Sequence, residues 1–198
     1  MKRYLFGQSL GANHWTWGGV DYSKVLVEDP VITNLETWNT AQPDLDFKES
    51  AAFTDTSPTK QLTDSFILVW PNELSRIIVG AELTLMCTLR ADGSHTTYLD
   101  ELVARLLQVD MDGSTELITT FDYTFDTPPS FTANKWSDLV GAKIYKNLDY
   151  YELERFTTLL LEVDVYAHTV TDATNQKVRL HHGRGSSELV LAFVEVPR

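Results

Sequence analysis

Apolar and polar residues alternate along most of the chain beyond residue 63, and the alternation has a period of two. In 83–89 every second residue is apolar, and similar rows return in 157–166 and 188–196. A period of two sends alternate side chains to opposite faces of a β-strand, so one face of each strand is expected to point inward. The residues expected in the core are Leu159, Leu161, Val163, Leu189, Leu191 and Phe193.

Turn signals separate these strands. Asp92-Gly93 and Asp112-Gly113 are typical of hairpin turns, and the proline-containing segment 126–138 predicts a long connection between two sheets. The best helix candidate, 149–154, is short and equally compatible with an extended segment. Strands are expected at 66–70, 77–89, 102–109, 116–125, 157–166, 177–181 and 188–196. This pattern predicts an all-β fold, an antiparallel two-sheet sandwich of the jelly-roll kind.

Residues 1–62 lack a sustained period of two or of 3.6 and contain scattered prolines and aromatic residues. They are expected to form an extended, irregular N-terminal arm, and residues 63–198 are expected to form the sandwich domain. The arm is too rich in aromatic residues for a solvated linker, so it should lie along its own domain or along a neighbour. The residues expected to dock it on a partner are Trp15, Trp17, Tyr22 and Trp38.

The charge of the chain narrows the choice of partners. Its 198 residues include 28 acidic and 16 basic ones, which gives a formal net charge of −12. Such a field repels phosphate backbones and anionic lipid headgroups, so no direct contact with nucleic acid or a membrane is expected. The single cysteine, Cys87, permits no intrachain disulfide and fits a reducing cytoplasm.

Candidate metal ligands are sparse. His181 and His182 are adjacent, so in a strand they point to opposite faces and cannot ligate one ion together. The one weak candidate is a calcium site at Asp110, Asp112 and Glu116, where an Asp-x-Asp-Gly run offers hard oxygen ligands. A plain hairpin turn explains the same residues. We therefore expect no catalytic metal and no cofactor.

No catalytic residue is evident either. Cys87 lies in an alternating strand on the face expected to be buried, where a thiol is inert packing. Carboxylate pairs such as Asp122 with Asp126 could act as acid and base in a glycosidase, but a chain this acidic produces such pairs by chance. The glycines of 183–187 resemble a phosphate-binding loop without its lysine or its following helix. The chain is expected not to be an enzyme.

The layout resembles the small jelly-roll structural proteins of tailed bacteriophages. The resemblance is carried by the run 66–70 leading into 77–90, by 102–110 ending in Asp-Met-Asp-Gly, and by the terminal segment 188–197. It implies a virion component assembled in the host cytoplasm, foremost a capsid decoration or auxiliary head protein. Such a protein would form homo-oligomers and dock through its arm on other virion proteins, such as a capsid protein.

Two alternatives remain open beside this interpretation. A phage neck or tail-fibre component is a close variant of it. A carbohydrate-binding jelly-roll module belongs to a different class, and it is favoured by tryptophans on which sugar rings could stack. A small glycosidase or lyase comes third.

Overall fold

The computed structural model describes residues 2–9, 15–22, 24–28, 47–68, 76–170, 174–182 and 186–194. Within these residues all regular secondary structure is β-strand. No helix long and apolar enough to cross a membrane is found among them. The strands are β1 (Lys2–Ser9), β2 (Trp15–Trp17), β3 (Val20–Tyr22), β4 (Lys24–Glu28), β5 (Phe47–Glu49), β6 (Thr59–Leu68), β7 (Arg76–Arg90), β8 (Thr97–Val109), β9 (Thr115–Thr124), β10 (Ser130–Phe131), β11 (Val140–Leu153), β12 (Thr158–Thr169), β13 (Lys177–His181) and β14 (Glu188–Val194).

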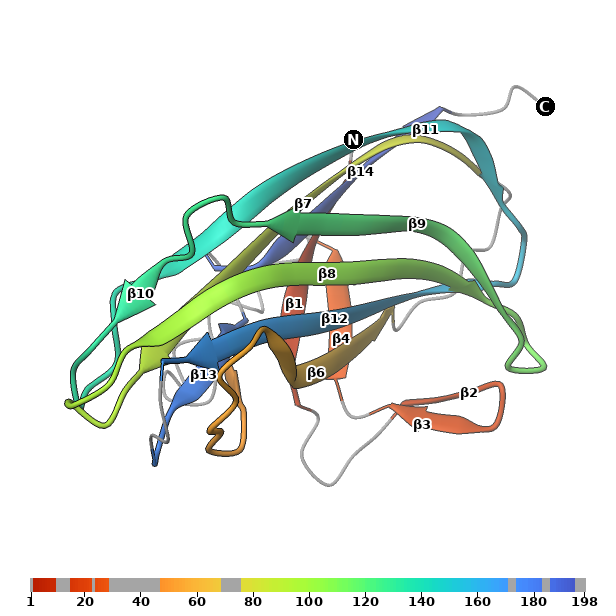
Figure 1. Ribbon diagram of the computed structural model, residues 1–198. Coiled ribbons are helices and arrows are strands. Elements are labelled where there is room, and N and C mark those ends of the chain that lie inside the picture. The colour runs from red at the N-terminus through yellow and green to blue at the C-terminus, as the bar shows by residue number, and fades with distance from the viewer. Residues whose placement is uncertain are drawn as a thin grey trace.

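Twelve of these strands form one sheet that folds over into two layers, and β2 pairs with β3 in a separate hairpin. The order is β10-β8-β12-β6-β4-β1-β14-β7-β13-β5, with β9 beside β8 and β11 beside β7. In Figure 1, β9, β8, β12 and β6 form one layer, while β11, β7 and β14 belong to the other. All described pairings are antiparallel except that of β4 with β6. The prediction of an all-β antiparallel sandwich is confirmed.

The space between the layers is filled largely by the rows that the period of two identified. Five of the six residues expected in the core are at most 1% exposed: Leu159, Leu161, Val163, Leu189 and Leu191. The sixth, Phe193, is only partly buried. The register of β14 against β7 shifts between Ala192 and Phe193, and such a shift interrupts the alternation of faces. The Phe193 ring is met instead by the Arg76 guanidinium, 5.6 Å from its centroid.

The N-terminal region contributes to the sandwich, whereas its sequence predicts an irregular arm. β1 lies between β14 and β4, and β4 pairs with β6, so these two strands connect the two layers. Phe6 of β1 is fully buried and packs against Phe66 of β6 with ring centroids 4.5 Å apart. The prediction of an irregular arm did not include β1, because a single short strand offers too few positions to establish a period.

β11 is the main strand that sequence patterning did not predict. It pairs with β7 from Val140 opposite Cys87 to Leu153 opposite Arg76. A Cβ on Gly141 would lie 1.9 Å from the Leu85 carbonyl oxygen, so glycine is required for this close approach. The helix candidate 149–154 falls mostly within β11 as extended chain, interrupted by a register shift after Asn147.

Candidate functional site

A histidine and a carboxylate meet on neighbouring strands at one end of the β8–β12 pair. His168 Nδ1 lies 2.8 Å from each carboxylate oxygen of Asp100. The imidazole stacks on the ring of Tyr98, with centroids 4.8 Å apart and planes 10° from parallel. The His168 side chain is 20% exposed and that of Asp100 only 8%, so the imidazole reaches solvent while the carboxylate lies beneath it.

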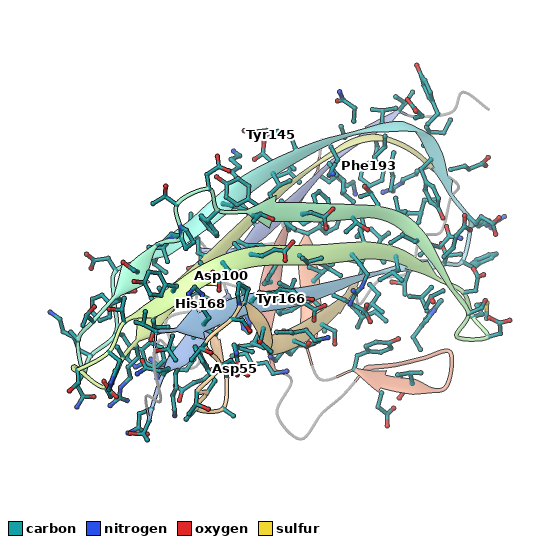
Figure 2. The ribbon with its side chains drawn as sticks, viewed as in Figure 1. Asp55, Asp100, Tyr145, Tyr166, His168 and Phe193 are labelled. Atoms are coloured by element: carbon teal, nitrogen blue, oxygen red, sulfur yellow. The ribbon has the colours of Figure 1, made fainter. Side chains whose placement is uncertain are left out.

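A β-bulge brings Asp100 to this position. Ala167 of β12 pairs with Leu99 and Tyr166 pairs with Glu101, so Asp100 is an extra residue in β8. A bulge turns the extra residue away from the regular alternation and is a common device for aiming a side chain at a functional site. Figure 2 shows Asp100, His168 and Tyr166 close together over β8 and β12.

A second bulge faces the first across β12. Val165 pairs with Leu62 and Tyr166 with Lys60, which leaves Gln61 as the extra residue of β6. The Gln61 amide donates to Asp55 Oδ2 (2.9 Å) and to the Ala167 carbonyl (3.2 Å). These bonds hold the loop that carries Asp55 against the end of β12, next to His168.

The surroundings of Asp100 set its electrostatics. Burial raises the pKa of its carboxyl above the ordinary value, while the hydrogen bond and the charge of His168 act in the opposite direction. A carboxylate at Nδ1 favours the tautomer that carries its proton there, which leaves Nε2 as a base. Nε2 has no hydrogen-bond partner within the part of the chain that the structure describes. The pair can therefore accept a proton from a molecule arriving from solvent.

The chain contains a second His–Asp pair, which has a structural explanation. His95 Nδ1 lies 2.9 Å from Asp92 Oδ2 within the Asp92-Gly93 turn. The backbone N–H groups of Ser94 and His95 donate to the other carboxylate oxygen. The bond from the Ser94 backbone, helped by His95, lowers the pKa of Asp92 to about 2. The contacts of this pair stabilise the turn, because an aspartate side chain in a turn commonly accepts bonds from the backbone two or three residues further on.

A buried ionic cluster joins β4 to β6. Lys24 Nζ lies 2.5 and 2.6 Å from the two oxygens of Asp64, and His182 Nε2 lies 3.0 Å from Oδ2. Burial alone would raise the pKa of Asp64, but the hydrogen bonds and charges of His182 and Lys24 hold it below the ordinary value. Asp64 is only 3% exposed, so we assign this cluster to structure, where losing one partner would leave a buried charge.

A shallow hollow lies on the outer face of the other layer. It has a volume of about 200 Å³ and is lined by residues of β7, β11 and β14, including Gly80, Tyr145 and Ala192. Its carboxylate, Glu82, is paired with Lys143. Tyr145 is labelled in Figure 2 well away from His168. The hollow and the His168–Asp100 pair are therefore separate features.

The residues of the calcium candidate lie in and after the turn between β8 and β9. Asp112 Oδ1 accepts bonds from the Ser114 amide (2.8 Å) and hydroxyl (2.6 Å), and the same hydroxyl lies 3.2 Å from Asp110 Oδ2. Burial raises the pKa of Tyr151, and the carboxylate of Glu116 beside it adds to this effect. Among the described residues no three potential ligands gather to hold a metal. The turn geometry accounts for Asp110 and Asp112, and the calcium site stays a prediction.

Two of the four aromatic residues expected to dock a partner lie against the protein's own sheet. Trp17 Nε1 donates to the Val109 carbonyl (3.1 Å), and Tyr22 packs beside it on a small apolar cluster. Trp15 pairs with Tyr22 through the backbone of the β2–β3 hairpin. Trp38 lies outside the described residues. Docking of these residues on a partner stays a prediction.

Sequence reasoning missed His168 and Asp100 because 68 positions separate them. One local signal was present. Buried residues recur every second position from Leu102 to Leu106, but Leu99 precedes Leu102 by three positions. A spacing of three between buried residues in a strand whose buried residues otherwise recur every second position indicates a bulge at Asp100–Glu101.

No protein-family model and no curated protein sequence matches this chain. Among solved structures it is similar to an aminopeptidase from a marine sediment archaeon (Thaumarchaeota archaeon), with a TM-score of 0.50 and 6% identity over 75% of this chain and 33% of that one. It is also similar to an α-amino acid ester hydrolase, with a TM-score of 0.47 and 12% identity over 96% of this chain and 32% of that one. This chain thus spans about a third of either protein, and at these identities the likeness concerns the fold.

The comparisons correct the virion hypothesis. The particle of infectious bursal disease virus matches with a TM-score of only 0.25 and 10% identity, over 76% of this chain and 38% of that one, so the likeness to virion proteins is limited to a weakly matching β fold. The match to the aminopeptidase has the higher TM-score, 0.50. The predictions of a capsid decoration protein and of a chain that is not an enzyme are therefore contradicted, and its sandwich is similar to one found within a hydrolase.

Proposed function

We propose that the chain is the β-sandwich part of a hydrolase, in which His168 held by Asp100 acts as general base. The observation that carries the proposal is the environment of the His168 imidazole. One of its nitrogens is held by a largely buried carboxylate, the ring is stacked on Tyr98, and one edge is open to solvent. The substrate class, esters or peptides, follows from the named activities of the two hydrolases with a similar fold.

The proposed reaction uses water as its nucleophile, because no hydroxyl or thiol is bonded to Nε2 among the described residues. Nε2 removes a proton from water as the water oxygen attacks the substrate carbonyl carbon. The resulting imidazolium is stabilised by the Asp100 carboxylate at Nδ1. It then returns the proton to the leaving oxygen or nitrogen as that bond breaks, so a carboxylic acid and an alcohol or amine are released.

The test compares the His168–Asp100 pair with the His95–Asp92 pair. Purified protein is assayed with chromogenic amino-acid esters and anilides, together with the variants His168→Gln, Asp100→Asn and the matched control His95→Gln. The first two should lose roughly 10²–10⁴-fold in kcat/KM, the usual contribution of a positioned base, whereas the control should retain the activity of the parent. Thermal unfolding checks that each variant is folded. Absence of turnover by the parent, or equal turnover by His168→Gln, would refute the proposal.

A further inference from the structure

Three fully buried polar side chains lie together inside the sandwich, where β8 begins and β12 ends. They are Thr97, Thr169 and Gln176. Thr97 and Thr169 are direct partners in the β8–β12 pairing, and Gln176 immediately precedes β13. Figure 1 shows the end of β12 and the strand β13 at the same end of the molecule. A polar group removed from water costs free energy unless it has a hydrogen-bond partner, so each donor and acceptor here requires one.

The Thr97 hydroxyl joins the two layers but meets only part of this requirement. Its Oγ1 lies 2.8 Å from the carbonyl oxygen of Arg90, at the end of β7, and 2.5 Å from Gln176 Oε1. A hydroxyl has a single hydrogen, so it donates to only one of these two acceptors at a time. The cluster therefore contains more acceptors than this donor can serve.

Two further atoms of the cluster have no hydrogen-bond partner among the described residues. They are Gln176 Nε2 and Thr169 Oγ1, and neither atom is exposed to solvent. Cross-strand partners have their Cβ atoms about 4.5–5.5 Å apart, which places Thr169 beside the Thr97 hydroxyl that the Gln176 amide contacts. The two unpaired atoms thus lie around one residue without bonding to each other.

The segment 53–55 holds both residues in place. The Phe53 backbone N–H donates to the Gln176 carbonyl (3.0 Å), and the Thr169 backbone N–H donates to the Asp55 carbonyl (2.8 Å). Gln176 and Thr169 are therefore bound by backbone groups only two residues apart, which fixes the space between their side chains. Neither side chain reaches solvent to find a partner there, because both are fully buried.

We propose that this space is a binding site for one internal water molecule. The water accepts a hydrogen bond from Gln176 Nε2 and donates one to Thr169 Oγ1. Buried waters make about two to four such bonds to polar groups that lack other partners. The side chains of Thr97, Thr169 and Gln176 are all neutral, so the site suits a neutral molecule and not an ion.

The bound water links the two layers directly behind the candidate functional site. His168 and Tyr98 are partners in the row next to Thr169 and Thr97, and successive residues of a strand point to opposite faces. The water connects this strand pair to the residue before β13, and it thereby helps to maintain the register that stacks His168 on Tyr98.

NMR and thermal unfolding test the site. A water molecule with a long residence time gives nuclear Overhauser effects to the protons beside it, so the parent should show one between water and the Gln176 side-chain amide. Thr169→Val removes the hydroxyl while nearly keeping the volume of the side chain. It should abolish this signal and lower the melting temperature by at least about 2–4 °C, the shift expected when one buried hydrogen bond is lost in a domain of this size.

Two further variants separate the water from other effects of a substitution. Thr169→Ser keeps the hydroxyl and should keep the water signal at Gln176. Thr158→Val is the matched control, because Thr158 is equally buried but donates directly to the Leu68 carbonyl (2.7 Å). It should also lower the melting temperature, but it should leave the water signal at Gln176 unchanged.

Two results would overturn the proposal. The first is a parent protein without a water signal at the Gln176 amide, which is measured without any variant. The second is a Thr169→Val protein that melts at or above the temperature of the parent. Removing a buried hydroxyl that has no partner at all relieves the cost of burying it, so the sign of the shift in melting temperature distinguishes the two cases.

Discussion

At the scale of single residues, burial gives the histidines of this protein different properties. His168 is stacked on Tyr98 and paired with a carboxylate, which suits it to hold and release a proton. His181 instead lies beside the Thr88 hydroxyl, 2.9 Å from Nε2, and has a cation close by at Arg179. The environment of His181 therefore opposes a positive charge on its ring.

His181 gives a prediction for stability against pH. Burial, with help from the charges of Arg179 and His182, lowers its pKa to about 4. The unfolded chain binds a proton at this histidine near its ordinary pKa of about 6.5, before the folded chain does. The free energy of unfolding should therefore have its full value above about pH 6.5 and should decline as the pH falls from about 6.5 to about 4.

Two measurements check this prediction. Titration of the imidazole signals by NMR should give a midpoint near pH 4 for His181. Chemical denaturation should give a stability that declines between pH 6.5 and 4 less steeply in His181→Gln than in the parent. A midpoint close to 6.5 would contradict the assigned environment.

At the scale of elements, two turns that are far apart in sequence fit together through glycine. Gly18 has φ 55° and Gly113 has φ 87°, so both occupy the left-handed region where a Cβ is costly. Their backbones also touch, which leaves no space for a side chain on Gly18. The contact thus joins the tip of the β2–β3 hairpin to the β8–β9 turn.

Gly18→Ala should detach the hairpin from the sheet. Gly19→Ala is the matched control, because Gly19 also has a positive φ (75°) but nothing lies within 4 Å of its Cβ position. Both changes carry the cost of a left-handed alanine, about 1–2 kcal/mol. Only Gly18→Ala adds the clash with Gly113, which should cost about 1–3 kcal/mol more.

Hydrogen exchange of 15–22 and the fluorescence of Trp17 report whether the hairpin is docked. We expect faster exchange and a solvent-exposed tryptophan in Gly18→Ala, with a smaller change in Gly19→Ala. Equal effects in the two variants would mean that the turn contact contributes nothing to docking.

At the scale of the whole molecule, β1 and β4 connect one layer to the other. Removing residues 1–28 would separate β14 from β6 and uncover Phe66, which packs on Phe6. The lost contacts should exceed the total stability of a domain, about 5–15 kcal/mol, so the shortened chain should not fold cooperatively. Circular dichroism and thermal unfolding measure this directly. A soluble, cooperatively folding product would show that residues 29–198 fold without β1–β4.

The sequence by itself determined the local part of this structure. Alternation in 83–89, 159–165 and 189–191 predicted strands and their buried faces, because the period of two is a property of each strand alone. The Asp92-Gly93 and Asp112-Gly113 turns followed from residue types that accept positive φ, and both glycines have it, with φ values of 90° and 87°. The repeated strand patterns, together with the turns between them, then predicted the sandwich.

Only the tertiary structure decided which distant segments meet. The neighbours of β1 and β4 were not encoded in any local pattern, because their burial comes from strands elsewhere in the chain. The pairing of His168 with Asp100 required both the β8–β12 register and a bulge at one position. A shift of one residue in that register would turn Asp100 to the other face, so the candidate site depends on long-range pairing that local preferences do not specify.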